Sequence, residues 1–168
     1  MRTSGLTCTL FLFIGFNAFS QVEDVAYDLM LQQLLSHSVR EISVAEAASK
    51  STSVLFLDAR EKEEYEVSHI QSAVQVGYDD FSLSSVKAIP KSRRIIVYCS
   101  VGYRSEKVAE KLMADGFVNV ANLYGGIFEW VNQGYQVMDG AGKPTSSVHA
   151  YSPVWGVWLL KGQKVYGK

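Results

Sequence analysis

The chain has 168 residues, of which 48% are hydrophobic, so it can form one domain with a substantial core. Its 16 Lys and Arg residues nearly balance its 17 Asp and Glu residues, which leaves a formal net charge of −1. This balance argues against a protein that binds nucleic acid or anionic lipid through a basic surface.

The N-terminal segment has the pattern of a secretory signal peptide. Arg2 precedes an apolar stretch from Leu6 to Phe19, and small residues lie around Ser20. The stretch is too short and too soon interrupted for a comfortable membrane span. We predict that residues 1–20 are a signal peptide cleaved near Ser20, and that the mature protein is periplasmic or secreted, with no membrane attachment. The alternatives are an uncleaved anchor and a lipid-modified Cys8.

Short helical and strand patterns alternate along the rest of the chain. An N-terminal helix is predicted within residues 21–37, and further helices over 43–49, 61–67, 81–86, 105–115 and 127–132. Strands are predicted over 39–42, 54–57, 73–76, 95–98 and 118–120. This alternation predicts an α/β fold with a central, mostly parallel five-stranded sheet flanked by helices on both faces. Ligands bind such sheets at the carboxyl ends of the strands, where Asp58 and Cys99 lie.

The segment from Cys99 to Ser105 joins a predicted buried strand to a helix. Amides at a helix start lack intrahelical acceptors and carry partial positive charge, so they stabilise an anion such as a thiolate. Gly102 allows a positive φ that turns amides inward, and Arg104 supplies a planar positive group for an anionic substrate. We therefore predict that Cys99 is a reactive nucleophile, with Ser105 as the cap of the helix. A buried structural cysteine is the alternative.

Three ordered motifs resemble those of the rhodanese-like sulfurtransferases. The segment 58–61 (Asp-Ala-Arg-Glu) resembles the family's DxRE motif, and 99–105 resembles the persulfide loop of its single-domain members. The segment 122–130 resembles the closing L-x-GG-x-x-x-W motif. The resemblance covers roughly Val39 to Val137, and Ser68 stands where the family usually has Gly. It implies a rhodanese-like domain over 38–138.

The resemblance implies a double-displacement reaction without a metal or organic cofactor. The Cys99 thiolate would take the outer sulfur of a donor such as thiosulfate, polysulfide or a persulfide, and pass it to cyanide or a thiol. Catalysis would rest on Cys99 and Arg104, with Asp58 and Arg60 supporting the loop. The residues expected to bind the substrate are Ser100, Val101, Gly102, Tyr103 and Ser105. The partners would be small-molecule donors and acceptors, or a partner thiol protein.

Two other functions are alternatives to sulfur transfer. A phosphatase family shares the fold but places five residues between Cys and Arg, whereas four separate Cys99 from Arg104, a ring too tight for phosphate. A persulfide carrier or sulfide-sensing module without turnover is the second alternative.

Because the loop has one arginine, no lysine, and Val101 and Tyr103 at its rim, we expect thiosulfate to be a poorer donor than polysulfide or an organic persulfide.

Several other polar residues are predicted to be structural. His69 is expected to make a hydrogen bond in a turn, and the glutamates of 61–66 to form a solvated helix face. Gly125-Gly126 is expected to allow close packing near the Cys99 loop. His37 and His149 lack neighbours at metal-ligand spacing, so no metal site is predicted.

Residues 139–168 form an aromatic-rich extension beyond the rhodanese-like segment. Two apolar runs, 154–160 and 163–166, flank Lys161-Gly162 and predict a β-hairpin. The extension is expected to pack on the domain and widen its core, or alternatively to roof the Cys99 pocket or meet a partner. The aromatic residues in question are Tyr151, Trp155, Trp158 and Tyr166.

Overall fold

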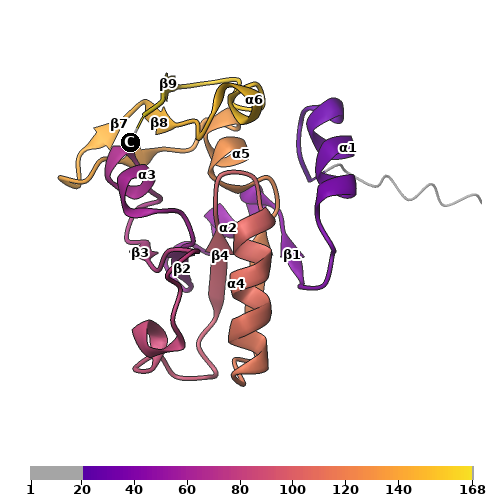
Figure 1. The fold of residues 1–168 in the computed structure, drawn as a ribbon, viewed down its shortest axis with the longest axis vertical. Helices are drawn as coiled ribbons and strands as arrows, with labels where there is room; N and C mark the ends of the chain where they lie inside the picture. The colour runs from indigo at the N-terminus through magenta and orange to yellow at the C-terminus, as the bar shows by residue number, and fades with distance from the viewer. Residues whose placement is uncertain (1–20, 168) are drawn as a thin grey trace, which may run out of the picture.

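A five-stranded parallel sheet forms the centre of the computed structural model, which describes residues 21–167 (Figure 1). The predicted signal peptide, 1–20, lies outside the described residues. In order across the sheet, the strands are β1 (Glu41–Ile42), β5 (Val120–Leu123), β4 (Ile95–Tyr98), β2 (Leu55–Asp58) and β3 (Val74–Gln75). Every neighbouring pair is parallel, so the predicted sheet is confirmed.

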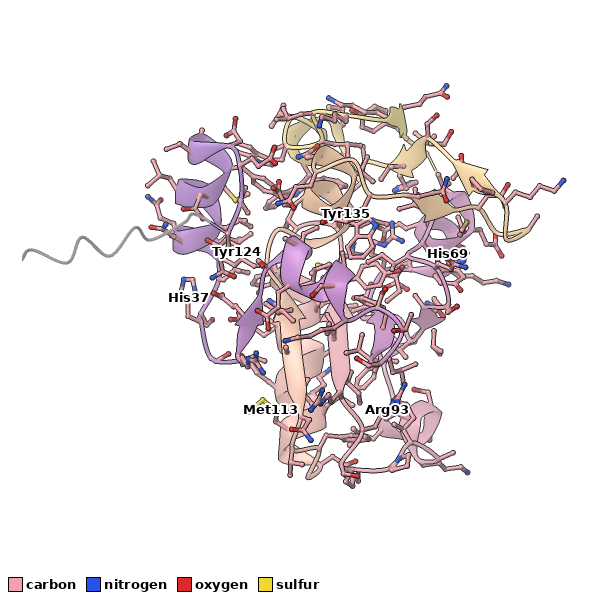
Figure 2. The ribbon with its side chains drawn as sticks, turned by 180° about the vertical axis from the view of Figure 1, so that it is seen from behind. His37, His69, Arg93, Met113, Tyr124 and Tyr135 are labelled. Atoms are coloured by element: carbon pink, nitrogen blue, oxygen red, sulfur yellow. The ribbon has the colours of Figure 1, made fainter. Side chains whose placement is uncertain are left out.

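Helices cover both faces of this sheet, as the alternating pattern predicted. They are α1 (Val25–Leu34), α2 (Val44–Ser49), α3 (Lys62–Val67), the 3₁₀ helix η1 (Leu83–Val86), α4 (Tyr103–Ala114), α5 (Gly126–Asn132) and α6 (Pro153–Gly156). Helix α4 lies in front of the sheet in Figure 1, and α2 lies in front in the opposite view of Figure 2. None of the helices within residues 21–167 has the length and apolar character needed to cross a membrane.

Strand β4 is buried on both faces, because its side chains alternate between two apolar clusters. Ile95 and Val97 pack in the cluster that contains α4, whereas Ile96 and Tyr98 pack in the cluster that contains α2 and α5. Cys99 continues the α4 side of this alternation. The strand thus delivers the cysteine into a covered position at its carboxyl end.

Helix α4 begins two residues earlier than predicted, which overturns the predicted capping role of Ser105. Gly102 has φ 124° and is the N-cap, so the helix starts directly after it. Ser105 therefore lies inside the first turn, where its hydroxyl oxygen is 3.0 Å from the Gly102 carbonyl oxygen. At the far end, the amide of Phe117 still bonds Leu112, so β5 begins at Val120 and not at residue 118.

The predicted C-terminal hairpin is wrong. Strand β9 (Gln163–Val165) pairs in parallel with β8 (Ser147–His149), and the helix α6 lies between them in the chain. The apolar run after Ser152 starts as a helix because Pro153 has a φ suited to a first helical turn and no amide to donate. A different short hairpin is present, formed by β6 (Val137–Met138) and β7 (Pro144–Thr145).

The C-terminal extension packs on the domain at the end of the molecule that holds Cys99. Leu159 is fully buried, and the ring of Trp158 stacks on Tyr27 of α1 with centroids 5.3 Å apart. The Asn132 side chain of α5 accepts from the Leu160 amide at 2.7 Å. In Figure 2, Tyr135 lies near this end, and Arg93 lies at the opposite end, where β4 begins.

Helix α5 starts in close contact with the backbone of the turn that carries Cys99. The amides of Ile127 and Phe128 donate to the carbonyls of Cys99 and Ser100, at 2.9 and 3.1 Å. A Cβ atom at Gly126 would lie 2.4 Å from the Cys99 oxygen and 2.6 Å from the Ser100 oxygen. The predicted close packing of Gly125-Gly126 near the loop is therefore confirmed.

We predict that Gly126→Ala lowers the free energy of unfolding by about 3 kcal/mol or more, because the new methyl group collides with backbone that cannot move aside. Gly116→Ala is the matched control: Gly116 also has a positive φ, 91°, but a Cβ there meets nothing within 4 Å. We expect the control to lose about 1 kcal/mol. Urea unfolding measures both, and equal losses would contradict the steric argument.

Candidate active site

Cys99 lies at the carboxyl end of β4 and is 1% exposed. Its Sγ accepts a hydrogen bond from the Gly102 amide at 3.1 Å. The Ser105 hydroxyl is 3.5 Å from the same sulfur, but it is much closer to Asn122 Oδ1, at 2.7 Å. Because a hydroxyl has one proton, the Gly102 amide is the firm donor to the sulfur. The arrangement brings together the predicted nucleophile and the glycine predicted to turn amides inward.

The side chain of Asn122, on β5, makes hydrogen bonds with two residues of the Cys99 loop. The sequence analysis gave Asn122 no role. Its side-chain amide donates to the Gly102 carbonyl at 3.0 Å, while its oxygen faces the Ser105 hydroxyl. Both residues are fully buried. These bonds hold the carbonyl side of Gly102, the residue whose N–H donates to Cys99 Sγ.

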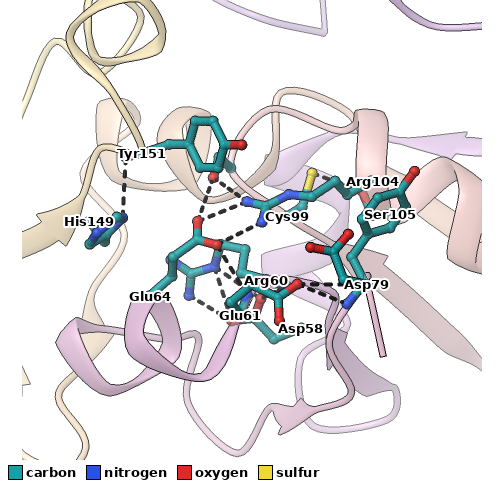
Figure 3. A network of polar contacts seen from close by, with 12 residues as sticks. Asp58, Arg60, Glu61, Glu64, Asp79, Cys99, Arg104, Ser105, His149 and Tyr151 are labelled. Carbon is teal, nitrogen blue, oxygen red and sulfur yellow. Dashed lines mark hydrogen bonds and ion pairs between the residues drawn. The ribbon is translucent and has the colours of Figure 1, made fainter. Parts of the chain in front are cut away.

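Arg104 forms a two-pronged ion pair with Glu64 of α3 (Figure 3). The two N···O distances are 2.7 and 2.8 Å, and the guanidinium also donates to the Ser100 hydroxyl at 3.0 Å. Glu64 is 3% exposed, so the predicted solvated face of α3 is wrong at this residue. The glutamate is buried because its partner lies in the Cys99 loop.

This ion pair holds both side chains in their charged forms. Burial opposes ionisation of Glu64, but hydrogen bonding and charge from Arg104, aided by Arg60, outweigh it and lower the Glu64 pKa. Burial likewise opposes the charge on Arg104, yet the hydrogen bond from Glu64 raises the Arg104 pKa. Arg104 is therefore a cation whose charge is largely offset within the site.

Asp58 and Arg60 form a second ion pair, and both side chains are fully buried. Arg60 also donates to the Ser68 carbonyl at 2.6 Å, and the Asp58 carboxylate receives the Arg60 amide at 2.9 Å. Their link to the Cys99 loop is indirect: the amide of Ala59 bonds the carbonyl of Tyr98, the residue before Cys99. The pair braces the strand ends from which the loop departs.

A pocket of about 370 Å³ opens above Cys99. Its walls come from α1, α3, the loop before η1, the Cys99 loop and the C-terminal extension, namely Leu34, Glu61, Tyr78, Asp79, Cys99, Ser100, Val101, Tyr103, Arg104, Tyr151 and Trp155. Thus Tyr151 and Trp155 line the pocket, while Trp158 packs on α1. Gly102 and Ser105, predicted to bind substrate, lie beneath the sulfur and not in the pocket wall.

The histidines make structural contacts. His69 stacks on Tyr65 and its Nδ1 lies 3.0 Å from the Tyr65 carbonyl, which confirms the predicted turn hydrogen bond. His149 Nδ1 accepts from the Tyr151 amide at 3.2 Å. Hydrogen bonds with the Gln32 carbonyl and the Glu41 carboxylate raise the pKa of His37, against a smaller opposing effect of burial. Over residues 21–167, no cluster of three His, Cys, Asp or Glu side chains is arranged to hold a metal.

The family model for the rhodanese-like domain matches residues 42–133, more than half of the chain. The chain belongs to this family. The match runs from Ile42, the last residue of β1, to just after α5, so it contains the two buried ion pairs, the Cys99 loop and Asn122, but not α1 or the C-terminal extension. Two parts of the pocket wall, Leu34 and the pair Tyr151 and Trp155, therefore come from outside the family's core.

Curated relatives include tRNA uridine(34) hydroxylases. The protein of that name from Hamiltonella defensa is 35% identical over 105 residues, 60% of this chain and 28% of its own length. One from Yersinia enterocolitica is 36% identical over 84 residues, 47% of this chain and 24% of its own length. The chain thus spans about a quarter of these relatives.

Solved structures have the same fold. The BH2092 protein of Bacillus halodurans is 25% identical, with a TM-score of 0.57 over 70% of this chain and 86% of its own. A thiosulfate sulfurtransferase from Pseudomonas aeruginosa is 22% identical, with a TM-score of 0.58 over 71% of this chain and 24% of its own. At that identity the likeness concerns the fold.

We predict that Glu64→Gln destabilises the rhodanese-like domain by about 3 kcal/mol at neutral pH, because it leaves the Arg104 charge without its partner. The difference from wild type should begin to narrow below about pH 4.3, the ordinary pKa of a glutamate in an unfolded chain, and should close only below the lowered pKa of Glu64 in the folded protein. Glu66→Gln, on the exposed side of α3, is the control and should change little. Urea unfolding at pH 7 and at a series of pH values below about 4.3 tests this, and a difference that does not narrow as the pH falls would contradict it.

Proposed function

We propose that this rhodanese-like protein is a sulfurtransferase that carries sulfane sulfur as a persulfide on Cys99. The observation that carries the proposal is the Gly102 amide, which donates to Cys99 Sγ at the floor of a pocket. A sulfur anion in this position receives a hydrogen bond and the field of the α4 N-terminus. The charge is thereby stabilised without a metal or organic cofactor.

In the first step, the Cys99 thiolate attacks the outer sulfur of the donor. With thiosulfate, a bond forms between Cys99 Sγ and that sulfur, the donor's S–S bond breaks, and its electron pair leaves with sulfite. Cys99 is then a persulfide anion, and no proton or external electron is needed. The added sulfur projects into the pocket, whose volume of about 370 Å³ accommodates it together with part of a donor.

In the second step, a thiophilic acceptor attacks the outer sulfur of the persulfide. Cyanide forms thiocyanate, and a thiolate forms a new persulfide; in both cases Cys99 departs as the thiolate that began the cycle. The same amide that supports the resting sulfur supports it as a leaving group. Uptake and release of the sulfur atom thus use the same hydrogen-bond donor, the Gly102 amide.

Arg104 acts in this proposal chiefly through position. Its two-pronged bond to Glu64 offsets its charge, so its attraction for a dianion such as thiosulfate is weak. This agrees with the expectation that thiosulfate is a poorer donor than polysulfide or an organic persulfide. The guanidinium also holds Ser100, the residue that follows Cys99 in the loop.

Export of the mature protein, after cleavage near Ser20, is proposed on the sequence of residues 1–20 alone. A partner thiol protein is proposed as an acceptor alongside small thiols. The tRNA uridine(34) hydroxylase name is not carried to this chain, because it spans about a quarter of those proteins.

We predict that the purified protein forms thiocyanate from thiosulfate or polysulfide and cyanide, and that Cys99→Ser lowers the rate by about 1,000-fold or more. Colorimetry of the ferric thiocyanate complex measures the rate of product formation. Equal rates in the two proteins would remove the enzyme assignment. A single burst of about one thiocyanate per chain without turnover would favour the persulfide carrier instead.

A further inference from the structure

The pocket over Cys99 has more negative than positive charge on its wall. Its charged lining residues are Glu61, Asp79 and Arg104. Arg104 is paired with Glu64, which lies just behind it. A molecule entering the pocket therefore meets a cation that is already compensated.

The two lining carboxylates differ in how far they are satisfied. Glu61 caps α3 and accepts from the amides of Tyr78 and Asp79, at 3.3 and 3.4 Å. The Asp79 side chain is exposed and makes no hydrogen bond or ion pair with any residue of 21–167. Asp79, which is labelled in Figure 3, thus adds an unpaired negative charge to the wall of the pocket.

The remaining wall is largely apolar and aromatic. Leu34, Val101, Tyr103 and Trp155 surround the approach to the sulfur, and the Tyr151 ring lies over the Arg104 guanidinium, 5.1 Å from Cζ to centroid. Such a wall favours a carbon chain over a strongly hydrated anion. Two of these residues belong to the C-terminal extension, which lies outside the matched family segment.

We propose that this pocket selects cationic aminothiols and their persulfides, compounds in which a short carbon chain separates the reacting sulfur from a positive charge. The carbon chain of the aminothiol would pack on the apolar wall of the pocket, while its ammonium group lies near Asp79. This inference rests on the proposed function for the role of Cys99 as the sulfur carrier, and it names the class of donor and acceptor.

The selectivity follows from the sign of the charge at the mouth. Two unit charges about 7 Å apart, in a half-solvated pocket, change a rate by about threefold to tenfold, in opposite directions for a cation and an anion. Salt at about 1 M reduces the Debye length to about 3 Å and should remove most of this difference. A preference that arose from shape alone would not depend on salt.

Charge-matched thiol reagents test the pocket without turnover. Aminoethyl and sulfonatoethyl methanethiosulfonate both react with a thiolate to form a mixed disulfide, with methanesulfinate as the leaving group, and they differ in the sign of their charge. Their rates at Cys99 are followed by peptide-level mass spectrometry, so that reaction at Cys8 is counted separately. The ratio of the two rates is the measured quantity.

We predict that Asp79→Asn lowers the ratio of cationic to anionic rate by about tenfold at physiological salt, because the two rates change in opposite directions. Asp80→Asn is the matched control, because Asp80 is the adjacent exposed aspartate and does not line the pocket. It should lower the ratio by less than about twofold. Equal effects of the two variants, or no effect of either, would overturn the assignment.

The same variants are then compared in sulfur transfer from the Cys99 persulfide to cysteamine and to 3-mercaptopropionate. We expect Asp79→Asn to shift the preference away from cysteamine in parallel with the reagent ratio. If the reagent rates depend on charge but no persulfide forms on Cys99, the proposed function is contradicted and the charge selectivity of the pocket still holds. If Cys99 transfers persulfide sulfur equally well in the wild type and in Asp79→Asn, this inference is contradicted and the proposed function still holds.

Discussion

The turn between β4 and α4 depends on its contact with the start of α5. Two carbonyls of that turn, those of Cys99 and Ser100, accept from consecutive amides of α5, and only a residue without Cβ fits at Gly126. These bonds use the carbonyls on one side of the turn, while the Gly102 amide is directed to the sulfur on the other. The position of the sulfur therefore depends on how the start of α5 packs against the turn that leads into α4.

The Glu64–Arg104 pair adds a cross-link between α3 and the Cys99 loop. A buried pair of this kind contributes little net stability, because taking two charges out of water offsets most of their attraction. Its structural consequence is orientation: the guanidinium contacts Glu64, Ser100 and the ring of Tyr151, so three segments of the chain meet on one side chain. It also explains why an arginine beside the nucleophile does not make the pocket positive.

Much of this architecture was predictable from local patterns. Strands β2 and β4 are continuous apolar runs, which indicate strands covered on both faces, and Gly102 marked the turn that follows. The nucleophile and the glycine below it were found in this way. Their neighbours were not, because Glu64 is forty residues from Arg104 in the chain and is one of three glutamates in the short helix α3.

The remaining errors have similar causes. Asn122 lies beyond the predicted strand 118–120, so its place in a buried strand was missed, and burial of a polar side chain indicates that it is hydrogen-bonded but does not identify its partner. In the extension, the apolar content of 154–160 outweighed Pro153, which was the available sign of a helix start. The pocket wall combines α1, the loop before η1 and the extension, and no local pattern predicts which distant segments meet.

The central claim is that Cys99 accepts and releases a single sulfur atom. Mass spectrometry of the protein after incubation with polysulfide, and after removal of the donor, tests it most directly. The account predicts one added sulfur, located on the peptide that contains Cys99, which disappears when cyanide is added. A Cys99 peptide of unchanged mass, in a protein that is folded and has its thiol reduced, would contradict the account.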